Sequence, residues 1–379
     1  MNNKPTYLVL TPFFPSKDKF VGSFINDQLS ELRSQINFNF EIIKLVSFFS
    51  NEKDYSYNKF NVRIFKVIDF PFFIFPGFFN KLNVLRFKKF LIKRNISNIF
   101  FTHSHVIYPA LYLVKDFKNV KFIQNHGLDV LQLLNCRFSF IRRLQRKWLI
   151  RKSIQNVNNA DINIGVSKKV LSGFSQFKKY RPKNEYVFYN GVDRKKFYPK
   201  KTIKNKIFHV GCVANFWKIK DQITLIKAVQ IMIHDKIQIR LTFVGNGPTL
   251  SYCKKYVHMN NLSHFIDFLP VMNHHKLNVF YNKIDLFVLP SYYEAFGCVL
   301  LEAWATDTSI ILAKNQGFSE ILTSDQKKYF LFDEGSHEDL SKKIKNRMNH
   351  LEFFEFNSNY DIVNTVKDFT FNCINKFYK

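Results

Sequence analysis

Short apolar runs alternate with longer segments of mixed polarity along the whole chain. A second alternation of this kind begins at Ile207. Continuous apolar runs are typical of strands buried on both faces, and strands that alternate with helices form parallel sheets. The pattern therefore predicts an α/β protein with two parallel-sheet units. The runs that predict strands in the first unit are Tyr7–Thr11, Phe40–Val46, Ile99–Thr102, Lys121–Gln124, Ile162–Gly165 and Tyr186–Tyr189.

A lysine-rich link, Asp193–Lys206, separates the two alternations. The final segment, Ile362–Tyr378, predicts a closing helix. We place a first domain at residues 1–195, a second at 196–360 and the closing helix at 361–379. Ligands of open α/β sheets bind outside the carboxyl ends of the strands, so we expect the active site in a cleft between the domains.

One segment combines a strand, a loop and a helix with two glutamates. Leu286–Leu289 is an apolar run typical of a buried strand, and Glu294 lies in the loop that follows. Gly297 allows a close backbone approach, and Cys298–Ala305 forms an apolar helix whose first amides point at the loop. Glu302 lies one to two turns into this helix. The two carboxylates therefore meet one ligand from different directions, and the segment predicts a diphosphate site.

This segment resembles the nucleotide-sugar site of retaining glycosyltransferases of family 4, which have the GT-B fold. Further resemblances to that family follow in order over most of the chain. They are His103-Ser104-His105, Tyr108-Pro109, His126-Gly127-Leu128-Asp129, Val166-Ser167-Lys168, Tyr189–Asp193, Leu241–Pro248 and His264–Pro290. The resemblance implies two Rossmann-like domains facing across a cleft, with the C-terminal helix crossing back to the first domain.

Several residues depart from the family's pattern. The family usually has glycine where this chain has Asp221, Asp307 and Gln316. It usually has proline where this chain has Ser309, and arginine where it has Asn215. The resemblance makes that arginine the partner of a phosphate-binding lysine, which is Lys220 here. Lys218 is the candidate for the missing charge, although a lysine does not reproduce arginine's bidentate geometry.

The resemblance also implies roles for the residues of the second domain. Lys220, with Lys218 as helper, would neutralise the diphosphate leaving group, and the backbone amides around Phe296 and Gly297 would bind the same diphosphate. Glu302 would accept hydrogen bonds from the ribose hydroxyls.

The predicted catalytic residues are Glu294 and His126. Glu294 would face the donor sugar and support an oxocarbenium-like transition state. His126, beside Gly127 on a loop after a strand, would contact the donor sugar or the acceptor. Gly22 would bring backbone close to the acceptor or the diphosphate.

The sequence predicts no metal and no cofactor. No D-x-D pair occurs, which argues against the other large glycosyltransferase fold, where such a pair holds a divalent cation on the diphosphate. His274 and His275 are adjacent, so they would point apart on a helix.

Composition favours a cytosolic enzyme of ordinary size. The 379 residues suit two domains, and 46% hydrophobic residues can build two cores. The 45 phenylalanines, with abundant Lys, Asn and Ile, indicate an AT-rich genome. We expect no signal peptide, and no apolar run approaches the roughly 20 residues that span a bilayer. Widely spaced cysteines without a C-x-x-C pair predict free thiols in a reducing compartment: Cys136, Cys212, Cys253, Cys298 and Cys373.

The net charge of +28 is unevenly distributed. Residues 1–200 hold 35 Lys and Arg against 12 Asp and Glu, and residues 201–379 hold 22 against 17. Codon bias acts on both halves alike, so the excess argues for an anionic partner of the first half. The aromatic stretch Phe70–Phe79 and the basic segments Lys81–Arg94 and Arg137–Lys152 favour peripheral docking on an anionic membrane. Their alternative interpretation is an apolar core stripe with solvated lysines.

The sequence contains no recognised nucleic-acid-binding pattern, so we predict no nucleic-acid partner. The predicted function is transfer of a sugar from a nucleotide donor to a lipid-linked or saccharide acceptor, with retention, in bacterial surface polysaccharide (lipopolysaccharide) assembly at the inner face of the cytoplasmic membrane. Two alternatives remain. One is a GT-B-like sugar-nucleotide epimerase. The other is a degenerate transferase that acts as a membrane- or nucleic-acid-binding scaffold, for which Asn215 and Asp307 are the main support.

Overall fold

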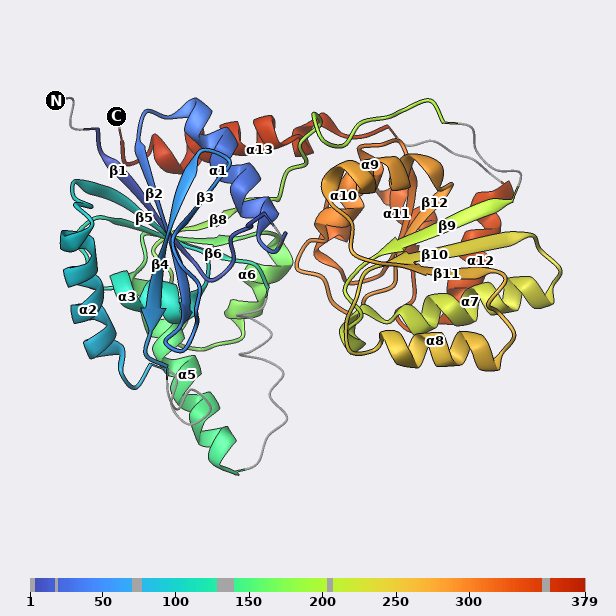
Figure 1. Ribbon diagram of the computed structural model, residues 1–379, viewed down its shortest axis with the longest axis horizontal. Helices are drawn as coiled ribbons and strands as arrows, with labels where there is room; N and C mark the ends of the chain where they lie inside the picture. Colours follow the sequence, from blue (N-terminus) through green and yellow to red (C-terminus); the bar gives the residue numbers. More distant parts are fainter. Residues whose placement is uncertain are drawn as a thin grey trace. The chain divides into compact units, whose positions relative to one another are not determined.

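The computed structural model describes residues 4–17, 20–69, 77–127, 140–202, 207–349 and 355–378, with only the backbone for 140–145. The chain forms two compact units (Figure 1). The first unit comprises Met1–Asn190 and Val363–Lys379, and the second comprises Gly191–Ile362. The sequence placed this boundary at residues 195/196. Each unit is built on one mainly parallel sheet.

The first unit contains an eight-stranded sheet in the order β3-β4-β2-β1-β5-β6-β7-β8. All neighbouring strands are parallel except β3 and β4. Every residue of β1 is buried, as expected for a central strand covered on both faces. The strands are β1 (Thr6–Thr11), β2 (Asn39–Ser47), β3 (Tyr55–Tyr57), β4 (Phe60–Val67), β5 (Ile99–Ser104), β6 (Val120–Asn125), β7 (Ile162–Gly165) and β8 (Glu185–Val187).

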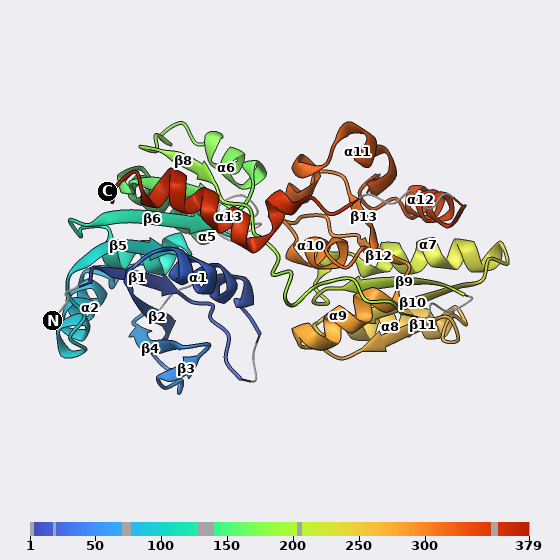
Figure 2. The ribbon, with the colours of Figure 1, turned by 90° about the horizontal axis from the view of Figure 1, so that it is seen from above.

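Helices cover both faces of this sheet (Figures 1 and 2). Helices α1 and α13 lie side by side on one face, where the Gln35 side chain hydrogen-bonds Val363 and Thr370. The rings of Phe369 and Phe188 stack there with centroids 4.5 Å apart. The helices are α1 (Ser23–Gln35), α2 (Asn80–Lys93), η1 (Ile107–Leu111), α3 (Tyr112–Val114), α5 (Phe140–Asn159), α6 (Lys168–Ser175), α13 (Ile362–Phe369) and η5 (Thr370–Ile374).

The second unit contains a six-stranded parallel sheet in the order β11-β10-β9-β12-β13-β14. Its strands are β9 (Phe208–Val213), β10 (Ile239–Val244), β11 (Ile266–Leu269), β12 (Leu286–Leu289), β13 (Ser309–Ala313) and β14 (Leu331–Phe332). Helices α7, α8 and α12 cover one face, and α9, α10 and α11 cover the other (Figure 1). The apolar faces of α7 and α12 pack on the sheet and form a large core.

The helical segments of the second unit are mostly short. They are η2 (Lys218–Lys220), α7 (Gln222–His234), α8 (Leu250–Met259), α9 (His274–Lys283), α10 (Cys298–Trp304), η3 (Gly317–Ile321), α11 (Ser324–Phe330), α12 (His337–Asn349) and η4 (Ser358–Tyr360). The loops that follow β9, β10 and β12 lie together at the carboxyl ends of neighbouring strands, which is where parallel sheets place their ligands.

The predicted fold class, two Rossmann-like α/β units with a C-terminal helix packed on the first, is confirmed. Two strands of the first unit escaped the sequence analysis. Strand β4 alternates buried and exposed positions and pairs in parallel with β2, and β3 forms a hairpin with it. The stretch 70–76, Leu128, Asp129 and Cys136 lie outside the described residues.

Two departures from the family's glycines have a local explanation. Asp221 has a φ of 47° and Asp307 a φ of 60°, so both adopt the left-handed conformation that glycine favours. Aspartate tolerates this conformation better than most residues because its short side chain hydrogen-bonds locally. The backbone at both residues therefore retains a glycine-like conformation.

In the described part of the chain, no helix is both long and apolar enough to cross a membrane.

Candidate active site

Glu294 lies in the loop after β12, and three hydrogen-bonding groups hold it. Lys220 Nζ lies 2.6 Å from Glu294 Oε1, and Ser291 Oγ donates to the same oxygen at 2.7 Å. The amide of Gly317 donates to the Glu294 backbone carbonyl at 3.1 Å. The Glu294 side chain is only 12% exposed. Contacts to both the side chain and the backbone of Glu294 therefore hold its carboxylate in place.

Gln316, which occupies one of the family's glycine positions, supports this loop. Its side chain is buried, and Nε2 donates to the carbonyls of Leu289 and Ser291 at 3.2 and 2.9 Å. These carbonyls lie where β12 ends and would otherwise lack partners away from water. The larger residue therefore fastens the start of the Glu294 loop.

Lys220 comes from the loop after β9, at the end of the short helix η2. The amide of Tyr292 donates to the Ile219 carbonyl at 2.9 Å and joins this loop to the Glu294 loop. The loop after β10 also packs closely on it, because a Cβ at Gly245 would lie 2.1 Å from the Ala214 carbonyl oxygen. Glycine is therefore required at position 245, because the two backbones approach each other too closely there for a side chain.

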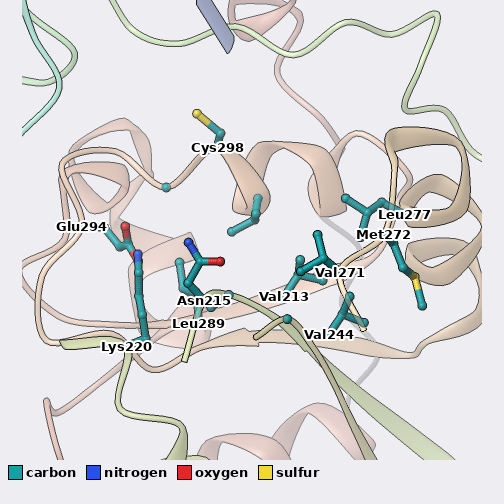
Figure 3. A pocket seen from close by; sticks show the side chains of 14 residues that line it. Val213, Asn215, Lys220, Val244, Val271, Met272, Leu277, Leu289, Glu294 and Cys298 are labelled. Atoms are coloured by element: carbon teal, nitrogen blue, oxygen red, sulfur yellow. The ribbon is translucent and has the colours of Figure 1, made fainter. Parts of the chain in front are cut away.

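These loops enclose a cavity of about 300 Å³, which we call the β9–β12 cavity (Figure 3). Lys220, Glu294 and Asn215 lie on one side of it, and apolar side chains lie on the other. The apolar and small residues that line it include Val213, Val244, Val271, Met272, Leu277, Leu289 and Cys298. A cavity with a charged end and an apolar wall suits a ligand with an anionic group and a flat, weakly polar ring.

The predicted donor-site residues divide between three places. Lys220, Glu294 and Gly297 line the β9–β12 cavity. Lys218 lines a separate hollow instead, because successive side chains of the η2 turn point in different directions. The Phe296 side chain is buried in the core against Phe318.

Glu302 lies four residues after Cys298, on the same face of α10. Its Oε2 accepts a hydrogen bond from the hydroxyl of Tyr281 at 2.9 Å. Tyr281 is fully buried and comes from α9, so it fixes the direction of the carboxylate. Glu302 does not line the cavity. It lies about one helical turn after Cys298, which does line the cavity.

His126 and Gly22 belong to the first unit and lie at the carboxyl-end edge of its sheet. His126 Nε2 lies 3.0 Å from His105 Nδ1, and the two rings stack at 5.3 Å between centroids. His103 stacks on the other side of His105 at 4.4 Å, and its Nδ1 lies 2.8 Å from the hydroxyl of the buried Tyr7. The chain thus forms a stack of three histidines.

Burial makes this stack electrically neutral. It lowers the pKa of His126 to about 3 and, together with nearby His126, lowers the pKa of His103 to about 3. The pKa of His105 also lies well below its ordinary value because of burial. Neutral imidazoles each carry one donor and one acceptor nitrogen, so the stack can form hydrogen bonds to uncharged groups at neutral pH.

Gly22 shapes the loop that precedes α1. It has a φ of 85°, and a Cβ there would lie 2.7 Å from the Phe13 carbonyl oxygen. Two residues later, the Phe24 ring packs on His126 at 4.9 Å between centroids. The glycine loop and the histidine stack are therefore parts of one local arrangement.

Sequence analysis missed the apolar wall of the cavity and the supports of its charged end. Val271 and Met272 follow β11, so the rule that ligands bind beyond strand ends would have indicated them. The hydrogen bond from Tyr281 to Glu302 has no local signal, because Tyr281 comes from another helix, whereas Ser291 lies only three residues before Glu294.

Comparison with known proteins agrees with this geometry. Residues 193–353 match the family model of glycosyl transferases group 1. An uncharacterised glycosyltransferase of Methanocaldococcus jannaschii is 26% identical over 282 residues, or 73% of each chain. The O-antigen chain mannosyltransferase of Salmonella typhimurium is 25% identical over 186 residues, which are 49% of this chain and half the length of that relative.

A solved structure extends the similarity to the whole fold. The sucrose-phosphate synthase of Thermosynechococcus elongatus superposes with a TM-score of 0.73 at 17% identity, over 97% of this chain and 94% of that one. The matched family segment contains Lys220, Glu294 and Glu302, and so includes both loops of the β9–β12 cavity. The chain is a glycosyltransferase with the GT-B fold, and its residues 193–353 match the family model of glycosyl transferases group 1.

Proposed function

We propose that the chain transfers a sugar from a nucleotide-sugar donor to a lipid-linked or saccharide acceptor, with retention of anomeric configuration. The observation that carries this proposal is the Lys220–Glu294 ion pair at one end of a cavity whose other wall is apolar. The apolar wall suits the base, and the ion pair suits the diphosphate and the sugar.

In this proposal the bond between the sugar's anomeric carbon and the diphosphate oxygen breaks and leaves its electron pair on that oxygen. The acceptor's hydroxyl oxygen bonds to the same carbon on the same face, and its proton passes to the leaving diphosphate. Lys220 stabilises the negative charge that develops on the leaving diphosphate, and Glu294 supports the positive charge on the sugar. The backbone around Phe296 and Gly297 adds hydrogen bonds to the diphosphate. Glu302, held by Tyr281, accepts from the ribose hydroxyls. Lys218 contributes little, since it lines the separate hollow.

His126 contacts the donor sugar or the acceptor as a neutral hydrogen-bonding group. Its lowered pKa supports this role, because a neutral imidazole can donate to or accept from a hydroxyl without introducing charge. Gly22 holds the adjacent loop close to the Phe13 backbone, so its contribution is to the shape of that edge.

The reaction requires no metal in this proposal, since Lys220 supplies the positive charge for the diphosphate. Transfer measured in excess chelator should equal transfer in added Mg²⁺. A loss of activity in chelator that Mg²⁺ restores would contradict metal independence.

The proposed setting is bacterial surface polysaccharide assembly, with the enzyme peripheral on the inner face of the cytoplasmic membrane. The similarity to an O-antigen chain mannosyltransferase supports the pathway. A hollow of about 670 Å³ between α5 and the segment after α6 supports the docking. It carries basic residues beside the apolar Ile150 and Phe177: Lys147, Arg151, Lys178 and Lys179.

Vesicle flotation tests the docking. The wild type should bind vesicles that contain anionic lipid, less so as salt rises, because salt screens charges beyond about 8 Å at physiological ionic strength. A variant with Gln at Lys88, Lys89, Arg142, Arg143 and Arg146 should bind less. Of these residues, Lys88 and Lys89 are exposed on α2, whereas the side chains of Arg142 and Arg143, like Phe72, Phe73 and Phe75, lie outside the described residues. Equal binding by both proteins would contradict membrane docking through these residues.

A thermal-shift screen of UDP-, GDP- and ADP-sugars tests the transfer itself. A donor present at 100 times its dissociation constant should stabilise the protein by about 2.7 kcal/mol. The donor that stabilises it should then be consumed in the presence of an acceptor. Stabilisation by none of the three classes, or conversion of the donor to an epimer without acceptor, would contradict the proposal.

A further inference from the structure

A second hollow, of about 350 Å³, lies in the second unit, and we call it the aromatic hollow. Three of its residues present exposed rings: Trp217 is 56%, Tyr252 60% and Tyr292 44% exposed. These rings come from the loop after β9, from α8 and from the loop after β12. Several large aromatic side chains exposed around one hollow indicate a binding surface, whereas a single exposed apolar residue does not.

Two polar atoms of residues that line the aromatic hollow lack hydrogen-bond partners. They are Oδ2 of Asp221 and Oγ1 of Thr249, and both are buried. Asp221 is 5% exposed, and the Thr224 side chain and backbone and the Tyr292 hydroxyl interact with its carboxyl, whereas Oδ2 has no hydrogen-bond partner. An unpaired buried polar atom costs roughly 1–3 kcal/mol, so such atoms call for a ligand or another explanation.

The loops after β9 and β12 contribute residues to both the aromatic hollow and the β9–β12 cavity. Lys220 and Glu294 point into the cavity, whereas Lys218 and Tyr292, each two residues earlier in the chain, line the hollow. The hydrogen bond from the Tyr292 amide to the Ile219 carbonyl fastens these two loops to each other. Each of the two loops therefore contributes residues to both the cavity and the hollow.

We propose that the aromatic hollow is a saccharide-binding subsite, separate from the donor cavity. A sugar ring packs its C–H face on Trp217 or Tyr252, and its hydroxyls donate to Asp221 Oδ2 and bond with Thr249 Oγ1. A saccharide combines an apolar face with several hydroxyl donors, and so matches both the rings and the unpaired oxygens. The assignment rests on the enzyme's acting on saccharides, and the sugar bound there is part of the acceptor or product chain.

Thr249→Val is the sharpest test variant. It removes a hydroxyl that has no partner in the structure and keeps the shape of the side chain, so stability should not fall. Trp217→Ala removes the exposed ring. The matched control is Phe371→Ala, which removes a ring that is 73% exposed on the first unit. Melting temperatures of all variants check that they fold.

The probe is an array of defined mannose-, glucose-, galactose- and N-acetylhexosamine-containing oligosaccharides, incubated with the full-length protein. We expect the wild type and Phe371→Ala to bind the same subset, and Trp217→Ala and Thr249→Val to lose at least tenfold in binding. Absence of oligosaccharide binding by the wild type, or equal binding by all four proteins, would overturn the proposal.

Nucleotide titrations separate this proposal from the proposed function. Trp217→Ala and Thr249→Val should bind the stabilising nucleotide-sugar as the wild type does, whereas Lys220→Ala should lose that binding and keep oligosaccharide binding. Loss of nucleotide affinity in the two hollow variants would make the hollow a nucleotide site and overturn the saccharide assignment. Unchanged nucleotide affinity in Lys220→Ala would overturn the donor site alone.

Discussion

The carboxyl-end edges of the two sheets carry different chemistry. In the second unit, Lys220 and Glu294 form an ion pair 2.6 Å long, with side chains 24% and 12% exposed. In the first unit, His103, His105 and His126 form a neutral stack, in which His103 and His105 are buried and His126 is half-buried. Both groups lie at or just beyond the carboxyl ends of central parallel strands, so strand position alone does not set the electrostatics of an edge.

We propose that the two edges carry out different tasks. A charged pair in a partly exposed cavity suits a reaction in which charge develops on a leaving group. Neutral imidazoles suit the binding of hydroxyl groups, which need donors and acceptors rather than net charge. The variants below test whether the two edges differ in this way.

Glu294→Gln should have the largest effect. The substitution keeps the size of the side chain and removes the charge that faces the donor sugar, so transfer should fall about a hundredfold or more. Nucleotide affinity should change little, because Lys220 remains. The measurement is the rate of donor consumption with acceptor present, and a native rate would remove Glu294 from the chemistry.

The first unit should lose stability in acid because of its histidines. Their folded pKa values lie below the ordinary 6.5, near 3 for His103 and His126, so between these values the unfolded chain binds protons that the folded chain does not. The free energy of unfolding should be fully retained above pH 6.5 and fall below it, by about 1.4 kcal/mol per pH unit for each histidine that titrates.

Urea unfolding at pH 7.5, 6 and 5 measures this slope, and His126→Asn should reduce it. The same slope in both proteins would show that His126 is not held neutral.

Replacing the glycine that precedes the helix by alanine should also destabilise the protein to a different extent at each edge. Gly22 and Gly297 have φ values of 85° and 88°, so alanine should cost about 1–2 kcal/mol at either position. A Cβ at Gly22 meets the Phe13 carbonyl oxygen at 2.7 Å, whereas at Gly297 it meets the flexible end of Leu300 at 3.1 Å. Gly22→Ala should therefore destabilise more in urea unfolding, and the reverse order would contradict the rigid packing of the first edge.

Tyr281→Phe should have the smallest effect. It removes the hydrogen bond that orients Glu302 and leaves the ring in the core, so nucleotide affinity should fall about three- to tenfold. Glu302→Ala should weaken nucleotide binding at least as much. Calorimetric titration measures both, and unchanged affinity in both variants would remove Glu302 from the nucleotide site.

Much of the fold was predictable because buried parallel strands leave continuous apolar runs, as in Leu286–Leu289. Strand β4 was missed because it alternates buried and exposed positions, and so lacks such a run. Glu294 and Lys220 were identified through their motifs, and the structure brings them into one cavity although 74 residues separate them.

Side-chain direction was harder to predict. Lys218 and Lys220 belong to the same short turn, yet they line different hollows, and sequence spacing alone does not show this. The histidine stack depends on β5 and β6 being neighbours in the sheet, which places His105 against His126. The support of the Glu294 loop by Gln316 was read only as a departure from the family's pattern, because its partners are backbone carbonyls distant in sequence.

The most direct test of the central claim, that the Lys220–Glu294 cavity binds the donor, is calorimetric titration with the donor's nucleoside diphosphate. Lys220→Ala should bind it at least tenfold more weakly than the wild type, whereas Lys218→Ala should bind within about twofold, since Lys218 lines the aromatic hollow. Equal affinity in the wild type and Lys220→Ala, or a larger loss in Lys218→Ala, would contradict the account.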